Sequence, residues 1–284
     1  MEELDRHINQ ARSLPAPPRL VLELLLRLSQ PNVDSTKVVR AISQDLVLTE
    51  KLLALCNSAY FAAATATTDL QEAITRLGFK QIYELVAVVH GARTLLAPQK
   101  AYGLEAGDHW RHSVAAAIAA RLVAGPAGVD ENKAFTAALL HDVGKIILNL
   151  PLTPLVRQLD EAVERDQSTL VDAEKKLLKV QHAEIGGRLL ERWSFPEEIV
   201  TAVWFHHQPR AARPHDRLAA CIWLGNWMAL MLGYGFGRHP FALEWRREVL
   251  ETLHLAESDL DPLLMQMIDS LDMVETLATV PLAS

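Results

Sequence analysis

The pair His141-Asp142 is the strongest candidate for chemistry in this sequence, because it lies in an apolar run that extends from Leu139 to Ile146. A carboxylate is rarely left without a partner among apolar residues. Imidazole nitrogen and carboxylate oxygen are both ordinary ligands of divalent metal ions. The pair therefore predicts a metal site whose remaining ligands come from other parts of the chain.

Several other histidines occupy similar surroundings, on predicted helices or at their ends and among small or apolar residues. They are His112, His182, His206 and His207. Adjacent helical residues point about 100° apart, so each of the pairs His141-Asp142 and His206-His207 could offer two ligands to one ion. Together these residues predict a metal centre in a helical bundle. His182 taken alone is typical of a hydrogen-bonded core histidine.

Lys145 follows the His-Asp pair by one helical turn and shares a face with His141. Its ammonium group could pair with a phosphate or with the neighbouring carboxylate. Gly144 and Gly186 would let another helix or a ligand approach closely.

Two further histidines and both cysteines are weaker candidates. His109 shares a face with His112 and could substitute for it; otherwise His109 and His239 are expected at the surface or in loops. Cys56 and Cys221 lie far apart in apolar contexts, which predicts buried thiols in a reducing compartment.

The elements that would position these residues are helices almost throughout. Half of the 284 residues are hydrophobic and only 6% are aromatic, and no stretch alternates as a strand does. After an extended stretch at 14–18, the apolar spacing predicts one helix from Leu20 to a stop at Pro31, a second that begins at a cap at Asp34-Ser35, and a third from Asp45 to Asn57-Ser58. One further helix is predicted to carry His141-Asp142. The same spacing predicts the remaining helices at 70–77, 80–96, 108–124, 153–165, 171–192, 196–206, 216–232 and 260–277. Residues 98–107 are the best candidate linker.

Charge and hydropathy exclude several classes of protein. The net charge is −7, and neither half of the chain is a basic platform for nucleic acid. Residues 1–12 are charged and do not form a signal peptide. Residues 218–237 carry no charge, but Asn226 and three glycines interrupt them, so a buried core helix at 216–232 is expected instead of a membrane span. We expect a cytoplasmic protein.

Two sets of phrases resemble known families. His141-Asp142-x-Gly144-Lys145, His182-x-x-x-Gly186 and His206-His207 resemble the HD superfamily of metal-dependent phosphohydrolases, especially the branch that hydrolyses cyclic di-GMP. Leu14-Pro15, Asp45-x-x-Leu48-x-x-x-Leu52, Asn57-Ser58-x-x-Phe61, Ala73-Ile74-x-x-Leu77-Gly78 and Trp193-x-Phe195-Pro196 are similar to the HDOD domain, the HD-related output domain of bacterial signalling proteins. The resemblance covers roughly residues 10–235 and implies an all-α, HD-like multi-helix bundle with an N-terminal helical subdomain.

The resemblance also implies a domain plan and a cofactor. Residues 1–12 would be an extension, 13–97 the N-terminal helical subdomain, 98–107 the linker, and 108–284 the HD-like subdomain with a C-terminal helical tail. The site would hold one or two divalent ions, with Fe, Mn, Ni and Zn not distinguished.

Two departures from the phosphohydrolase pattern bear on catalysis. Asn226 occupies the place of the last Asp ligand, and a neutral carbonyl oxygen is a weaker ligand than a carboxylate. The paired His206-His207 is followed by Gln208-Pro209 and a short loop, where the cyclic di-GMP branch has a Glu and a longer Gly-Tyr-Pro loop. HDOD domains generally lose some or all of the metal ligands, and this chain keeps more of them than the resemblance would lead one to expect.

Three functions follow as hypotheses. The preferred one is a non-catalytic signalling module that binds a partner protein or a small phosphorylated ligand. The second is a metal-dependent phosphohydrolase, in which the ion lowers the pKa of an attacking water and Lys145 contacts the phosphate. The third, DNA binding through a helix-turn-helix at 70–96, is disfavoured because residues 81–89 are mostly apolar and are better explained as buried packing.

Overall fold

The structure, a computed structural model, describes residues 2–10, 19–28, 33–57, 67–164, 169–235 and 246–278. The stretch 14–18, Pro31, Ser58, Phe61 and His239 lie outside these residues. Among the described residues the regular structure is helical, and the one β-bridge, between Gln99 and Leu104, belongs to no strand. The all-α prediction is therefore confirmed.

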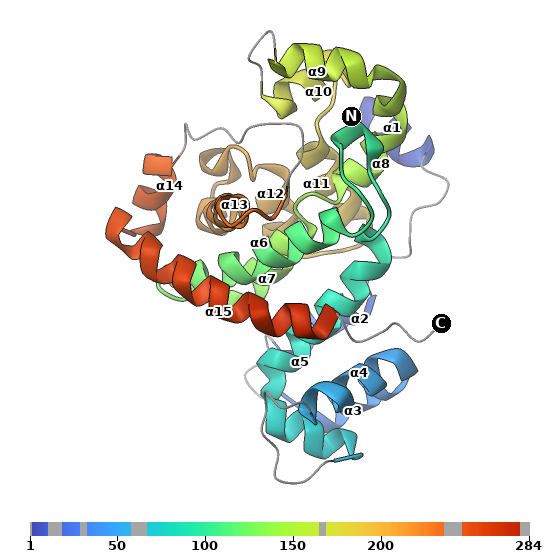
Figure 1. Cartoon of the computed structure of the whole chain (residues 1–284), viewed down its shortest axis with the longest axis vertical. Helices are drawn as coiled ribbons and strands as arrows, with labels where there is room; N and C mark the ends of the chain where they lie inside the picture. The colour runs from blue at the N-terminus through green and yellow to red at the C-terminus, as the bar shows by residue number, and fades with distance from the viewer. Residues whose placement is uncertain are drawn as a thin grey trace. The chain divides into compact units, whose positions relative to one another are not determined.

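The chain divides into two compact units (Figure 1). The larger unit comprises Met1–Pro15 and Gly91–Met267, and the smaller comprises Ala16–His90 and Ile268–Ser284. Two of the three boundaries fall within helices, α5 (Leu70–Leu95) and α15 (Leu260–Ala278). All the predicted metal ligands belong to the larger unit.

The smaller unit contains α2 (Arg19–Leu28), α3 (Ser35–Ser43), α4 (Leu46–Cys56) and the first part of α5. The Asp34 carboxylate accepts the N–H of Thr36 at 3.1 Å, and the Asp45 carboxylate accepts the N–H of Leu48 at 3.1 Å. Both aspartates thus cap their helices, because they satisfy N–H groups that have no partner inside the helix. This confirms the cap predicted at Asp34 and the helix start predicted at Asp45.

A sharp change of backbone direction divides α5 at Gly78, whose φ is +78°. Glycine adopts this conformation without the steric cost that a side chain would add. The predicted helix end at this residue is confirmed. Beyond it, residues 82–89 are buried except for the half-buried Glu84, in agreement with the packing expected there.

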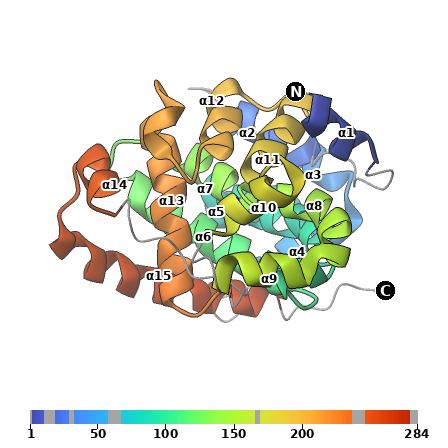
Figure 2. The same ribbon diagram turned by 90° about the horizontal axis from the view of Figure 1, so that it is seen from above.

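The larger unit is a bundle built on buried helices. Its helices are α1 (Glu2–Gln10), α6 (Asp108–Ala124), α7 (Glu131–Leu140), α8 (Gly144–Leu152), α9 (Val156–Glu164), α10 (Leu170–Leu178), α11 (His182–Arg192), α12 (Glu197–Trp204), α13 (Asp216–Met231) and α14 (Arg246–Leu253). Helix α6 packs against α7 and α13, α11 packs against α8 and α12, and α9 packs against α10 (Figure 2).

The close approach of α6 and α13 depends on small residues. A Cβ atom at Gly225 would lie 2.6 Å from the Ala116 carbonyl oxygen and 2.7 Å from the Ala120 amide nitrogen, closer than packed atoms come. Residues Leu218 to Ala229 of α13 are all buried, so the predicted core helix at 216–232 is confirmed. Cys221, on this helix, and Cys56 are both buried free thiols.

Residues 2–10 and 98–107 are folded parts of the larger unit. Leu4 and Ile8 of α1 lie in a hydrophobic core shared with α8 and α11, and Asp5 pairs with Arg188 at 3.1 Å. The expected linker at 98–107 contains the 3₁₀ helix Lys100–Tyr102, whose Tyr102 is 2% exposed. Both segments therefore take part in the core.

The single helix predicted at 171–192 is wrong. Lys179 adopts a left-handed conformation with φ +65° and ends α10, and Gln181 with Glu184 forms a capping box that starts α11. A capping box supplies partners for N–H groups that a new helix leaves open. The chain therefore turns between two helices where the apolar pattern alone suggested continuity.

One stretch, Glu131–Glu164, is long and apolar enough to cross a membrane by composition, but 72% of its apolar window is buried inside the protein. It contains α7, α8 and α9, which pack within the larger unit. Such burial is typical of the core of a soluble domain.

Candidate metal centre

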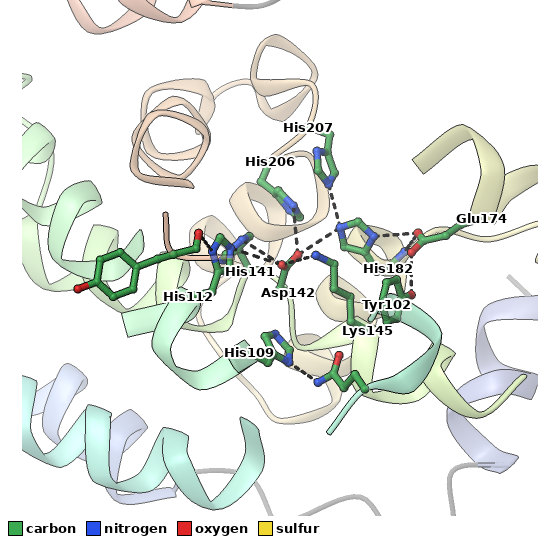
Figure 3. A network of polar contacts seen from close by, with 12 residues as sticks. Tyr102, His109, His112, His141, Asp142, Lys145, Glu174, His182, His206 and His207 are labelled. Carbon is green, nitrogen blue, oxygen red and sulfur yellow. Dashed lines mark hydrogen bonds and ion pairs between the residues drawn. The ribbon is translucent and has the colours of Figure 1, made fainter. Parts of the chain in front are cut away.

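Four parts of the larger unit bring the predicted ligands together (Figure 3). Helix α6 carries His112, the turn between α7 and α8 carries His141-Asp142, α11 begins with His182, and the turn after α12 carries His206-His207. The prediction that His141-Asp142 lies on a helix is wrong, because α7 ends at Leu140. His141 nevertheless keeps right-handed helical dihedral angles, φ −57° and ψ −36°.

The six side chains form two groups of three. One group is His112, His141 and Asp142, and the other is His182, His206 and His207. Within each group the candidate ligand atoms lie within 4.8 Å of one another. His182, which alone suggested a core histidine, thus belongs to the centre.

Asp142 joins the two groups through its two carboxylate oxygens. Its Oδ2 lies 3.4 Å from His141 Nε2 and 3.7 Å from His112 Nε2. Its Oδ1 lies 3.2 Å from His182 Nε2 and 4.0 Å from His206 Nε2. One carboxylate therefore faces both groups.

Main-chain carbonyls fix the orientation of two of the histidines. His141 Nδ1 lies 2.6 Å from the Ala138 carbonyl oxygen, and His206 Nδ1 lies 2.7 Å from that of Val203. A carbonyl only accepts, so each Nδ1 carries the proton and each Nε2 presents a lone pair. Both Nε2 atoms are buried without a hydrogen-bond partner among the described residues, as a metal-ligating nitrogen would be.

The electrostatics keep three of the candidate ligands, His141, His206 and Asp142, in the form that binds a cation. Burial lowers the pKa of His141 well below its ordinary value and that of His206 to about 3, so both rings are neutral at pH 7. Burial alone would raise the pKa of Asp142, but its positively charged neighbours, Lys145 among them, hold that pKa well below 3.8. Metal ions bind the deprotonated forms of these side chains.

Lys145 makes the carboxylate contact that was one of its two predicted roles. Its Nζ donates to Asp142 Oδ2 at 2.5 Å and lies 5.6 Å from the centre of the Tyr102 ring. A phosphate contact through Lys145 stays a prediction.

Sequence reasoning missed two residues that hold His182. The Glu174 carboxylate accepts the main-chain N–H of His182 at 2.8 Å and lies 2.8 Å from its ring Nδ1. The Tyr102 hydroxyl donates to the other Glu174 oxygen at 2.7 Å. The only sequence signal was a glutamate eight residues before a histidine, which a surface helix would equally show.

Two other candidate residues, His109 and Asn226, are also buried in the larger unit. His109 is 1% exposed, not at the surface, and its Nδ1 contacts the Gln99 side chain. It belongs to neither group of candidate ligands, so the structure gives no support for its substituting for His112. Asn226 is 6% exposed on α13, and its side-chain oxygen has no hydrogen-bond partner among the described residues. Its role as a weak ligand stays a prediction.

The residues present fit a divalent metal ion. Five histidines and one carboxylate converge, and within the described part of the chain the Nε2 atoms of His141 and His206 have no hydrogen-bond partner. Imidazole and carboxylate donors suit Fe, Mn, Ni and Zn alike, so the donor set does not select one of them.

An all-helical bundle with a centre built on an adjacent His-Asp pair defines an HD-superfamily domain. The chain belongs to the HDOD domain family, whose model matches residues 14–209. This confirms the resemblance found in the sequence.

Solved structures share the fold. A crystal structure of an HDOD domain protein of unknown function from Geobacter sulfurreducens is 24% identical, with a TM-score of 0.76 over 98% of this chain and 96% of that one. The crystal structure of a protein from Marinobacter aquaeolei VT8 that has been assigned to signal transduction is 20% identical, with a TM-score of 0.72 over 98% of this chain and 64% of that one.

Two curated relatives match this chain over less than half of their own length. An uncharacterized protein of Treponema pallidum (strain Nichols) is 27% identical over 215 residues, which are 75% of this chain and 41% of that protein. Ribonuclease Y of Lawsonia intracellularis (strain PHE/MN1-00) is 31% identical over 112 residues, 39% of this chain and 16% of that protein. The chain thus spans less than half the length of either relative.

Proposed function

We propose that this chain is a cytoplasmic signalling module that holds one or two divalent metal ions and acts by binding a partner protein, without catalytic turnover. The observation that carries the proposal is the shared position of Asp142 between two groups of buried histidines. An ion bound there would link α6, the α7–α8 turn, α11 and the end of α12. Its presence would stabilise one arrangement of these elements, which a partner could recognise.

Four features support a binding role over a catalytic one. Lys145, the candidate phosphate contact, is already paired with Asp142 at 2.5 Å. Asn226 replaces the carboxylate of the phosphohydrolase pattern, and His207 is followed by Gln208-Pro209 in place of the Glu and the longer loop. In addition, Asp142 is only 2% exposed, which leaves little room for a substrate beside it.

Elemental analysis combined with a phosphodiesterase screen tests this proposal. We expect the purified protein to contain a divalent transition metal, and His141→Ala to contain less of it. We expect cyclic dinucleotides and an aryl phosphodiester to be turned over no faster by the metal-loaded wild type than by His141→Ala. A wild type without bound metal contradicts the metal-holding role, and turnover that His141→Ala abolishes contradicts the non-catalytic role.

The second candidate is a metal-dependent phosphohydrolase acting on a cyclic dinucleotide or another phosphoester. The observation in its favour is that Asp142 faces two ligand groups, as expected of a site for two ions, with the Lys145 ammonium beside it. A bound ion would supply Lewis-acid stabilisation of phosphoester charge. The partial match to a ribonuclease adds a phosphodiester-cleaving relative. Turnover lost in both Asp142→Asn and His207→Ala would establish this function.

A further inference from the structure

Glu174 is a carboxylate that the predicted metal centre does not itself explain. It is 0% exposed, although it lies on α10 between Ala173 and Lys175. A glutamate is almost never fully buried unless it is paired. Its two oxygens accept from three donors, the Tyr102 hydroxyl and both the main-chain N–H and the ring of His182.

These contacts determine how His182 faces the centre. Because Glu174 takes up Nδ1, the opposite nitrogen of the ring, Nε2, points to His207 Nε2 at 2.8 Å and to Asp142 Oδ1 at 3.2 Å (Figure 3). A carboxylate behind a ligating histidine fixes its tautomer and makes the ring a stronger donor to a metal ion.

The other group has weaker support. His112 Nδ1 lies 3.3 Å from the Tyr234 carbonyl oxygen, and His141 Nδ1 contacts the carbonyl of Ala138. A neutral carbonyl polarises an imidazole less than an anionic carboxylate does. Only the group that contains His182 has a histidine backed by a buried negative charge among the contacts described.

Tyr102 in turn fixes Glu174. Its hydroxyl donates at 2.7 Å to the oxygen of Glu174 that is not directed at the His182 ring. The tyrosine is 2% exposed in the 3₁₀ helix Lys100–Tyr102, so the carboxylate is held by a residue that is itself fixed by packing. Both act through His182 and are positioning residues.

We propose that Glu174 and Tyr102 make the His182–His206–His207 group the tighter of two unequal metal subsites, so that this group is filled before the group of His112, His141 and Asp142. This inference rests on the metal-holding role proposed above, and adds an order of loading and two positioning residues to it.

Titration of the full chain with Co²⁺ after chelator treatment tests the proposal, with visible absorption and equilibrium dialysis as readouts. We expect two binding steps in the wild type. His207→Ala should remove the tighter step and His112→Ala the weaker one. Glu174→Gln should weaken the tighter step by about 10- to 100-fold and leave the weaker step within about threefold.

Glu184→Gln is the matched control. Glu184 is also a carboxylate at the start of α11, but it accepts the Gln181 N–H at 3.1 Å and contacts Lys175. Because it does not contact the His182 ring, its substitution should change neither step by more than about threefold. An equal effect of Glu184→Gln and Glu174→Gln would overturn the assignment.

Tyr102→Phe keeps the inference testable if Glu174→Gln fails to fold, since it removes one hydroxyl and preserves the ring. We expect it to weaken the tighter step by about fivefold, the effect of one hydrogen bond of about 1 kcal/mol. An unchanged tighter step in Tyr102→Phe, or a tighter step that disappears in His112→Ala, overturns the inference. Absence of any Co²⁺ binding by the wild type would instead overturn the metal-holding role itself.

Discussion

Lys145 and Asp142 form a partly buried ion pair in which the ammonium nitrogen lies 2.5 Å from Oδ2, the carboxylate oxygen that faces His141 and His112. The side chain of Asp142 is 3% exposed and that of Lys145 16%. The lysine thus occupies the side of the carboxylate where an ion held by His112 and His141 would bind. A metal ion bound there would compete with the ammonium group for the same oxygen.

Replacing Lys145 should therefore have two opposite effects. In Lys145→Met the metal-free protein should lose about 3 kcal/mol of stability, because the charge of Asp142 is left buried without this partner. Metal affinity should rise by about tenfold, since the competing cation is gone. Chemical unfolding and Co²⁺ titration measure the two quantities.

Lys133→Met is a suitable control, because Lys133 pairs with Glu198 at 2.7 Å where both side chains are partly exposed. We expect it to cost at most about 1 kcal/mol, the usual value for such a pair, and to leave metal affinity unchanged. A gain in affinity in this variant as well would show that net charge, not the contact with Asp142, is responsible.

Gly144 lies where α8 meets α11, and a Cβ atom there would overlap the main-chain carbonyl oxygen of His182. At Gly186 a Cβ atom would come no closer than 3.4 Å to any neighbour, an ordinary contact. Gly144→Ala should therefore destabilise the protein by about 3 kcal/mol or more, and Gly186→Ala by about 1 kcal/mol or less. Thermal or urea unfolding of the pair of variants decides the matter, and equal losses would contradict the predicted close contact.

The backbone at Gly235 supports His112 from the loop that follows α13. Its φ is +105°, and an added Cβ would lie 2.7 Å from His112 Nδ1. Gly235→Ala should push this ring away from the Tyr234 carbonyl and weaken metal binding at the His112 group by about tenfold.

Gly128→Ala controls for backbone strain in that experiment. Gly128 also has a positive φ, +64°, but nothing lies within 4 Å of its Cβ position. We expect a loss of about 1–2 kcal/mol in stability and no change in metal binding. If both variants weaken binding alike, the effect comes from stability and not from the position of His112.

The stability of the metal-free protein should fall in mild alkali. Burial alone would lower the pKa of His182, but the negative charges of Glu174 and Asp142 outweigh it and raise that pKa from 6.5 to about 9. The folded state therefore holds a proton that the unfolded chain releases near pH 6.5. Its stabilising contribution is complete below pH 6.5 and is lost as the pH rises through about 9.

Thermal unfolding of chelator-treated protein between pH 6 and pH 10 would measure this effect. We expect Tm to decrease across the range in the wild type. It should change less in Glu174→Gln, because this variant lacks the negative charge of Glu174 that raises the pKa of His182. A wild-type profile as flat as that of Glu174→Gln would argue against a protonated His182.

The candidate ligands could be found from the sequence because each stands out locally. His141-Asp142 and His206-His207 are polar pairs in apolar surroundings, and His112 precedes a run of small and apolar residues in a predicted helix. The helix caps Asp34 and Asp45 were equally visible, since capping depends on residues two or three positions apart.

What could not be predicted depends on contacts between distant residues. Tyr102 and Glu174 are 72 positions apart, and the sequence around each of them would equally suit a residue on the surface. The turn at Lys179 was missed because a lysine in the left-handed conformation gives no local signal of a helix end. The segment that forms α1 was predicted to be an extension because most of its residues are polar or charged. Two of its apolar residues, Leu4 and Ile8, lie in the hydrophobic core.

Of the six candidate ligands, His207 alone is partly exposed, and the other five are buried. An ion would therefore enter and leave past a single imidazole, and its exchange with solvent would be slow compared with that of an open site. Which metal the protein carries after purification would then reflect the metals available while it folded as much as their relative affinities.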